Sequence, residues 1–181
     1  VFKGPVARRM TAEQFVDAVW TITGNVPKKR DAEVRVPSEA KQAEQNGAEA
    51  NQPAGKAEGK KETYKLVRSS LVKSTLLMRA LGRPNREQVV TTRPAELSTL
   101  QALELNNGKE FVGLLNSGAK RFESSTREEL VDSLFMQCLC RSPSDEERAI
   151  AFDILGDDND GQGTVDLLWM VFMLPEFQLV N

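Results

Sequence analysis

The chain has 181 residues, a formal net charge of −2 and a sequence pI of about 5.4. This length is enough for one domain of ordinary size with a hydrophobic core. The acidic pI argues against nucleic-acid binding, which usually requires a basic stripe. Because the chain contains no histidine, catalysis by Ser-His-Asp or Cys-His groups and histidine-ligated zinc or haem are excluded within these residues.

Neither a membrane span nor a cofactor is predicted. The longest apolar run, Leu167 to Leu174, has eight residues, whereas a span needs about 20. Cys138 and Cys140 supply too few ligands for a tetrahedral metal site, so we interpret them as small core residues.

The chain begins at Val1 and enters a helix-start pattern within ten residues, so we expect a piece of a longer protein.

The first predicted helix covers residues 12–23. Thr11 and Gln14 have the spacing of a capping box, and Gly24 suits the residue that follows a helix. Apolar residues recur between them at helical spacing, namely Phe15, Val19 and Ile22.

A change of composition follows this helix. From Ser38 to Glu62, 25 residues contain no Val, Ile, Leu, Met, Phe, Trp or Tyr, so nothing offsets the entropy cost of ordering them. We predict a flexible low-complexity insert at 28–63, serving as a spacer or an interaction tail. Residues 1–27 and 64–181 are predicted to form one helical domain.

Further helices are predicted beyond the insert. An apolar stretch from Leu66 to Leu81 predicts a helix that ends at Gly82. Residues 88–92 are rich in β-branched side chains and favour an extended segment. The next helix precedes Gly108, with an apolar face made by Leu97, Leu100 and Leu103.

The C-terminal third predicts a series of helices with short links. One helix covers 109–121, with an apolar face formed by Phe111, Leu114, Leu115 and Phe122. Two more begin at the capping boxes Thr126–Glu129 and Ser144–Glu147. The last begins at Thr164 as N-cap, is apolar nearly all round and is ended or kinked by Pro175. The predicted fold is all-α, with six or seven helices in one irregular orthogonal bundle.

The most informative candidate site is an arginine-rich stretch with two prolines. Arg83, Arg86 and Arg93 could bind a carboxylate or phosphate of a partner. Alternatively they tie a long loop to helix ends and to Glu87, and we prefer this structural interpretation because irregular segments need their carbonyl groups satisfied.

Two other features receive structural interpretations. The acidic stretch 157–163 resembles a calcium loop, but neither frame that places glycine at position 6 supplies a glutamate at position 12, so a surface turn is preferred. Trp20, Trp169 and Phe172 lie at helical spacing among apolar residues and are expected in the core.

Several blocks of sequence resemble a known family. The N-terminal block runs from Arg8 to Ala18, the central one from Leu81 to Val89 and from Thr99 to Leu103, and the closing one includes Arg141-Ser142-Pro143 and Pro175-Glu176-Phe177. They are similar to the planctomycete PSD-type domain of unknown function, family fifteen fifty-three. This chain departs from the family pattern at Ser98-Thr99 and at Met173-Leu174.

The resemblance implies context rather than chemistry. Such domains sit at the C-terminal end of large exported proteins, often with a cytochrome-c-like haem domain. The implied partners are therefore other domains of the parent, a cytochrome-c-like domain among them, and the implied location is periplasmic or extracellular. The family carries no assigned catalytic residue.

Three functional hypotheses follow. The preferred one is a non-catalytic helical interaction or assembly module, which would expose an apolar patch in isolation. The alternative is part of an enzyme whose active site is completed by a missing N-terminal region, with Arg83, Arg86, Glu87 and Arg93 as candidates. A carbohydrate or peptide binder is the third, disfavoured because aromatic residues make up only 6% of the chain.

Overall fold

The computed structural model describes residues 7–28, 67–84, 98–156 and 161–180. Residues 7–26 and 74–180 belong to one compact unit, here called the main unit, and residues 27–28 and 67–73 to a second. In the second, a 3-10 turn covers Ser69–Leu71. The predicted insert at 28–63 lies, except for Lys28, outside the described residues. So does the predicted extended segment at 88–92.

The main unit confirms the all-α prediction. Its described residues contain seven α-helices of five residues or more: α1 (Ala12–Thr23), α3 (Leu76–Ala80), α4 (Thr99–Asn107), α5 (Lys109–Arg121), α6 (Arg127–Leu139), α7 (Asp145–Leu155) and α8 (Gly161–Met173). A short α9 (Pro175–Gln178) and a two-stranded sheet of β1 (Arg8–Arg9) and β2 (Leu179–Val180) complete it. The described helices include none long and apolar enough to cross a membrane.

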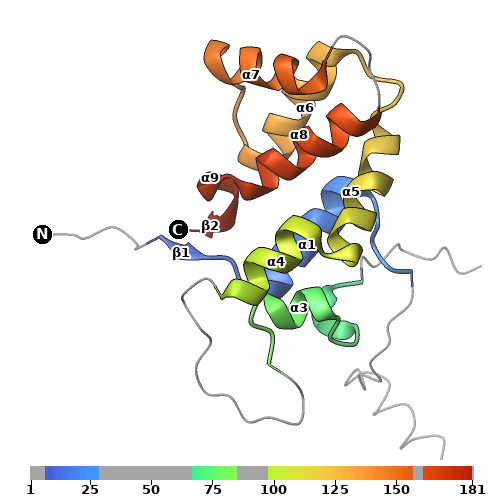
Figure 1. Cartoon of the computed structure of the whole chain (residues 1–181), viewed down its shortest axis with the longest axis vertical. Helices are drawn as coiled ribbons and strands as arrows, with labels where there is room; N and C mark the ends of the chain where they lie inside the picture. The colour runs from blue at the N-terminus through green and yellow to red at the C-terminus, as the bar shows by residue number, and fades with distance from the viewer. Residues whose placement is uncertain (1–6, 29–66, 85–97, 157–160, 181) are drawn as a thin grey trace, which may run out of the picture. The chain divides into compact units, whose positions relative to one another are not determined.

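Helix α8 lies at the centre of this arrangement. It contacts α5, α7, α6 and α9, and α5 in turn packs on α1 (Figure 1). Rings from four helices meet in the core: Phe15, Phe111, Phe172 and Phe177, with neighbouring centroids 5.0–6.3 Å apart. The two chain ends of the unit are therefore joined to its middle by one aromatic cluster.

Helix α1 forms as predicted. The Thr11 hydroxyl accepts from the Gln14 backbone N–H, and the Gln14 side chain accepts from the Thr11 N–H at 2.9 Å. Gly24 adopts φ 74° and ends the helix, in the left-handed conformation that glycine tolerates best.

The long helix predicted from Leu66 to Leu81 is wrong. Among the described residues of that stretch, an α-helix begins only at Leu76, because the Thr75 hydroxyl caps the Met78 N–H. Serine and threonine side chains compete with the helix for backbone groups, and so favour caps over helix interiors. The predicted end at Gly82 is correct: φ is 91°, and Arg83 N–H donates to the Met78 carbonyl at 2.9 Å.

The apolar face predicted for α4 is exposed to solvent. Leu100 and Leu103 are 47% and 56% exposed, whereas Gln101 and Leu105 are buried; Leu97 lies outside the described residues. Helix α4 contacts α3 and α5, and its buried side chains are Gln101 and Leu105. Periodicity identifies the faces of a helix, but the neighbouring elements decide which face is buried.

The remaining predicted boundaries hold except one. The capping boxes that start α6 and α7 are both formed, and α5 buries Phe111, Leu115 and Phe122. Thr164, predicted as an N-cap, instead lies inside α8 and is buried. The helix starts earlier at Gly161, and Gly163 lies so close to Leu155 that a Cβ would be 2.7 Å from its carbonyl oxygen.

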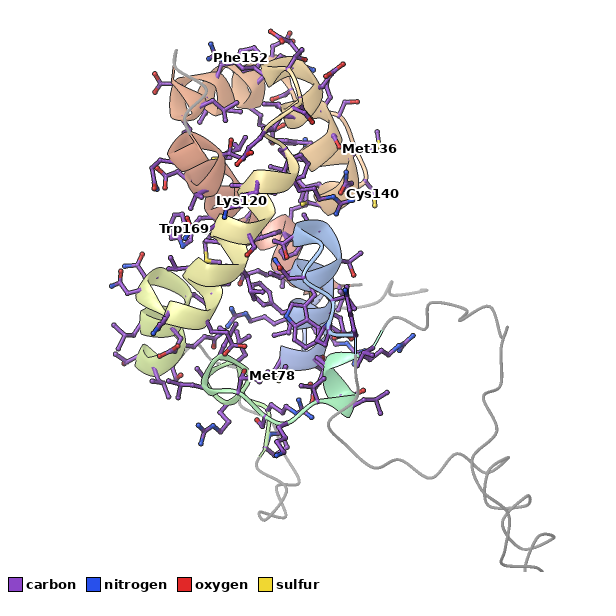
Figure 2. The ribbon with its side chains drawn as sticks, turned by 90° about the vertical axis from the view of Figure 1, so that its right-hand side faces the viewer. Met78, Lys120, Met136, Cys140, Phe152 and Trp169 are labelled. Atoms are coloured by element: carbon purple, nitrogen blue, oxygen red, sulfur yellow. The ribbon has the colours of Figure 1, made fainter. Side chains whose placement is uncertain are left out.

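Of the three aromatic residues expected in the core, two are buried there. Trp20 and Phe172 are buried, but Trp169 is 36% exposed and its side chain extends from the outer side of α8 (Figure 2). Pro175 follows the end of α8 and occupies the first turn of α9, as its rigid backbone favours.

Candidate interaction site

The small sheet fixes the position of one arginine. Arg9 lies opposite Leu179 and Arg8 lies opposite Val180 in the antiparallel register. Opposed residues point to the same face of a sheet, and successive residues point to opposite faces. Arg9 and Leu179 therefore share one face, and Arg8 lies on the other.

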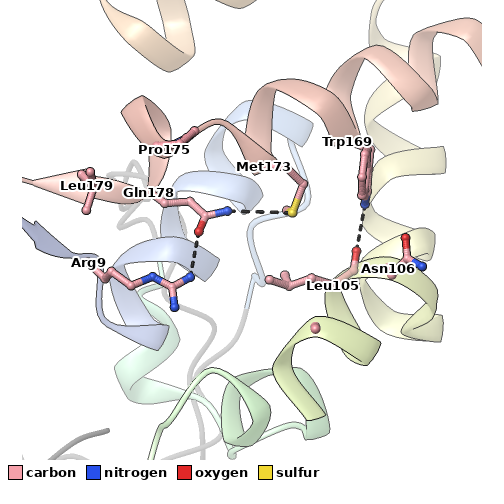
Figure 3. Close-up of a pocket in the computed structure, with 9 residues that line it drawn as sticks. Arg9, Leu105, Asn106, Trp169, Met173, Pro175, Gln178 and Leu179 are labelled. Carbon is pink, nitrogen blue, oxygen red and sulfur yellow. Dashed lines mark hydrogen bonds between the residues drawn. The ribbon is translucent and has the colours of Figure 1, made fainter. Parts of the chain in front are cut away.

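A groove lies on the Arg9 face, between α4 and the segment running from α8 to β2 (Figure 3). Its volume is about 530 Å³, within the range of typical ligand sites. We call it the α4 groove. Six apolar and three polar residues line it: Ala102, Leu105, Trp169, Met173, Pro175 and Leu179, with Arg9, Asn106 and Gln178.

Two hydrogen bonds link residues that line the α4 groove. The Trp169 indole N–H donates to the Leu105 carbonyl at 2.9 Å, which ties α8 to α4. Arg9 Nη2 donates to Gln178 Oε1 at 2.8 Å, which ties β1 to α9 (Figure 3). Gln178 Nε2 is held in turn by the Phe172 carbonyl at 3.0 Å. The groove is thus preformed, so a ligand would not have to order these side chains.

The outer surface of α3 and α4 is also apolar. Leu76, Leu100 and Leu103, here called the leucine patch, are each 47–56% exposed. Leu76 and Leu103 border a second hollow of about 590 Å³, whose rim includes Glu104 and Lys109. Helix α4 thus presents apolar side chains both to the groove and to this patch.

The arginine-rich stretch predicted as a site is described only in part. Arg86, Glu87 and Arg93 lie outside the described residues. The Arg83 Nε lies 3.7 Å from Glu13 Oε1, and Nη1 donates to the Met78 sulfur at 2.9 Å. These contacts tie the end of α3 to α1, and Arg83 is not among the residues that line the α4 groove.

Sequence reasoning missed a different arginine. Arg141 forms paired hydrogen bonds of 2.7–2.9 Å with Glu147 and with Glu176, and its guanidinium lies over the Phe135 ring. It therefore joins the end of α6 to the starts of α7 and α9. The resemblance and the capping box marked these residues separately, but no local pattern indicates that they meet.

The Arg141 cluster perturbs the ionisation of its members. Hydrogen bonds from the Arg141 side chain, followed by the Ser144 backbone, lower the pKa of Glu147 to about 2. Arg141 also lowers the pKa of Glu176, and the two carboxylates raise the pKa of Arg141. The Arg141 guanidinium is engaged by both carboxylates, so we interpret this cluster of one positive and two negative charges as a tie between helices.

The two thiols have different surroundings. Burial, with a smaller effect of Cys140, raises the pKa of Cys138 to about 12, which keeps this thiol protonated and unreactive. Cys140 is exposed and ends α6 with φ 55°. In the part of the chain that the structure describes, His, Cys, Asp and Glu side chains form no group of three or more able to hold a metal ion.

Comparison with known proteins identifies a family. The model of the PSD1 family, "Protein of unknown function (DUF1553)", matches residues 1–155. No curated protein and no solved structure matches the chain. The match includes the half of the α4 groove formed by Arg9 and α4, whereas the half formed by α8 to β2 follows it. Because the family model covers most of its length, the chain belongs to the PSD1 (DUF1553) family of unknown function.

Proposed function

We propose that this chain is a non-catalytic helical interaction or assembly module of a larger exported protein. The observation that supports it best is the inverted pattern of α4, which exposes Leu100 and Leu103 and buries Gln101. A surface helix normally turns its apolar stripe to the core. Contiguous exposed apolar side chains are typical of protein-interaction surfaces, so the leucine patch is where we place the main contact.

The partner in this proposal is another domain of the same parent protein, such as a cytochrome-c-like domain, and the parent is periplasmic or extracellular. The sequence resemblance supports these assignments. The alternative, an active site shared with the missing region, draws on Arg83, whose described contacts are with Glu13 and Met78. A patch of leucines favours docking over chemistry.

Binding between this chain and the purified preceding region of its parent tests the proposal. The double variant Leu100→Ser/Leu103→Ser should weaken binding at least tenfold, because apolar anchors at the centre of an interface carry most of its energy. The matched control is Met136→Ser/Ile150→Ser, which removes equally exposed apolar side chains from α6 and α7 and should change affinity less than twofold. Equal binding by both double variants would rule out the leucine patch as the interface.

A further inference from the structure

We propose that the α4 groove binds an extended peptide segment of the partner, which carries apolar side chains and one carboxylate that pairs with Arg9. This inference rests on the proposed interaction function and names the chemistry of the partner segment. It concerns the groove, whereas the proposed function depends first on the leucine patch.

The apolar part of the ligand follows from the walls. Trp169 and Leu179 are 36% and 42% exposed, and both line the groove together with Met173 and Pro175. Covering these side chains would remove apolar surface from water. The Trp169 indole N–H already donates to the Leu105 carbonyl. A ligand that covers the ring would therefore not leave this N–H without a hydrogen-bond acceptor.

The carboxylate follows from the charge of the lining. Arg9 is the one charged residue among the nine that line the groove, and Asn106 and Gln178 are neutral. Gln178 accepts one N–H of the Arg9 guanidinium at 2.8 Å and so orients it. A guanidinium has five donors, and an oriented one pairs well with a carboxylate. A cation without an acidic neighbour in the lining suits an anionic ligand group.

The shape of the site favours a peptide. The Trp169 ring and its hydrogen bond to the Leu105 carbonyl lie at one end of the groove, and the Arg9–Gln178 hydrogen bond lies at the other (Figure 3). An extended segment projects successive side chains at regular intervals, so it can place an apolar side chain at one end and an acidic one at the other. Because Trp169 and Leu179 at the two ends are open to solvent, a longer chain can enter and leave the groove.

Selection from a displayed library of random heptapeptides, with the whole chain as target, tests the inference. We expect the selected peptides to combine apolar residues with one Asp or Glu at a fixed spacing. The affinity of a selected peptide is then measured by fluorescence anisotropy. Arg9→Gln should weaken binding about tenfold, the effect of losing a hydrogen bond to a charged group.

Arg8 provides the matched control. Arg8→Gln makes the same charge change on the other face of β1 and should alter affinity less than twofold, and Arg9→Lys should retain much of the binding. Each variant is first melted, to show that loss of the Gln178 bond has not unfolded the sheet. Free octanoate is added as a competitor and should not displace the peptide at matched concentration.

The outcomes separate the two proposals. Selected peptides without an acidic residue, bound equally by wild type and Arg9→Gln, would reject the role of Arg9 and leave the leucine-patch result intact. If no peptide is enriched, or octanoate binds saturably where no peptide does, the peptide assignment is wrong. Loss of parent binding by the leucine-patch variant would still support the interaction function in either case.

Discussion

The orientation of α4 predicts that the same substitution has a large effect on stability at Leu105 and a small one at Leu103. Leu105 is 5% exposed and Leu103 is 56% exposed. Truncating a buried leucine to alanine costs about 2–5 kcal/mol of unfolding free energy. Because Leu105 borders the α4 groove, its surroundings can relax, so we expect the lower part of that range, about 2–3 kcal/mol. Leu103→Ala should change stability by less than about 0.5 kcal/mol.

Urea unfolding followed by circular dichroism measures both values, and thermal melts provide an independent check. For a chain of this length, 1 kcal/mol corresponds to about 2–4 °C in Tm. Leu105→Ala should therefore lower the Tm by about 4–12 °C, and Leu103→Ala by about 2 °C at most. A loss at Leu103 equal to that at Leu105 would show that the leucine patch is buried in solution, and would remove the basis of the proposed function.

Two further predictions concern stability. Gly118→Ala should cost about 1–2 kcal/mol of stability by overpacking, because its Cβ would lie 2.7 Å from Thr23 Cγ2. A Cβ at Gly113 would meet no such contact within 4 Å, so Gly113→Ala should gain about 0.5–1 kcal/mol through helix propensity. Thermal denaturation measures both, and a change in stability of the same sign at both positions would contradict the α1–α5 packing. The lowered pKa of Glu147 predicts stability that is complete above about pH 4.5 and lost as the pH falls toward 2. Glu147→Gln keeps a capping side chain but loses the charge that pairs with Arg141. The variant should therefore be less stable than wild type at pH 7, and the two stabilities should converge near pH 2, as measured by urea titrations across that range. Parallel curves of stability against pH would contradict the Arg141 pairing.

Local signals account for the parts of the fold that the sequence predicts well. The starts of α1, α6 and α7 depend on a hydroxyl and a Glu or Gln three residues later, and both partners lie within one turn. The end of α3 depends on one residue, Gly82, which adopts φ 91°. Such boundaries require no knowledge of the rest of the chain.

The candidate site could not be predicted, because its residues are distant in sequence. Arg9 and Gln178 are separated by 169 positions and Trp169 and Leu105 by 64, and no spacing rule joins them. The exposure of Leu103 has the same origin: apolar periodicity gives α4 a stripe, but the folded chain buries Gln101 and Leu105 instead. Arg83 was a candidate because of the residues next to it in the sequence, whereas Arg9 is a candidate because of the residues that surround it in the folded chain.

The two surfaces of α4 link binding to stability. A ligand that binds only the folded chain adds RT ln(1 + [L]/Kd) to its stability, about 2.7 kcal/mol when its concentration is a hundred times Kd. This is similar to the cost expected for losing the Leu105 side chain. Leu105 supports α4 from the groove side and Leu103 lies on its outer surface. A partner on the leucine patch would therefore stabilise α4 from its outer surface. A peptide in the groove would stabilise α4 from the other side, where Trp169 of α8 already donates a hydrogen bond to Leu105.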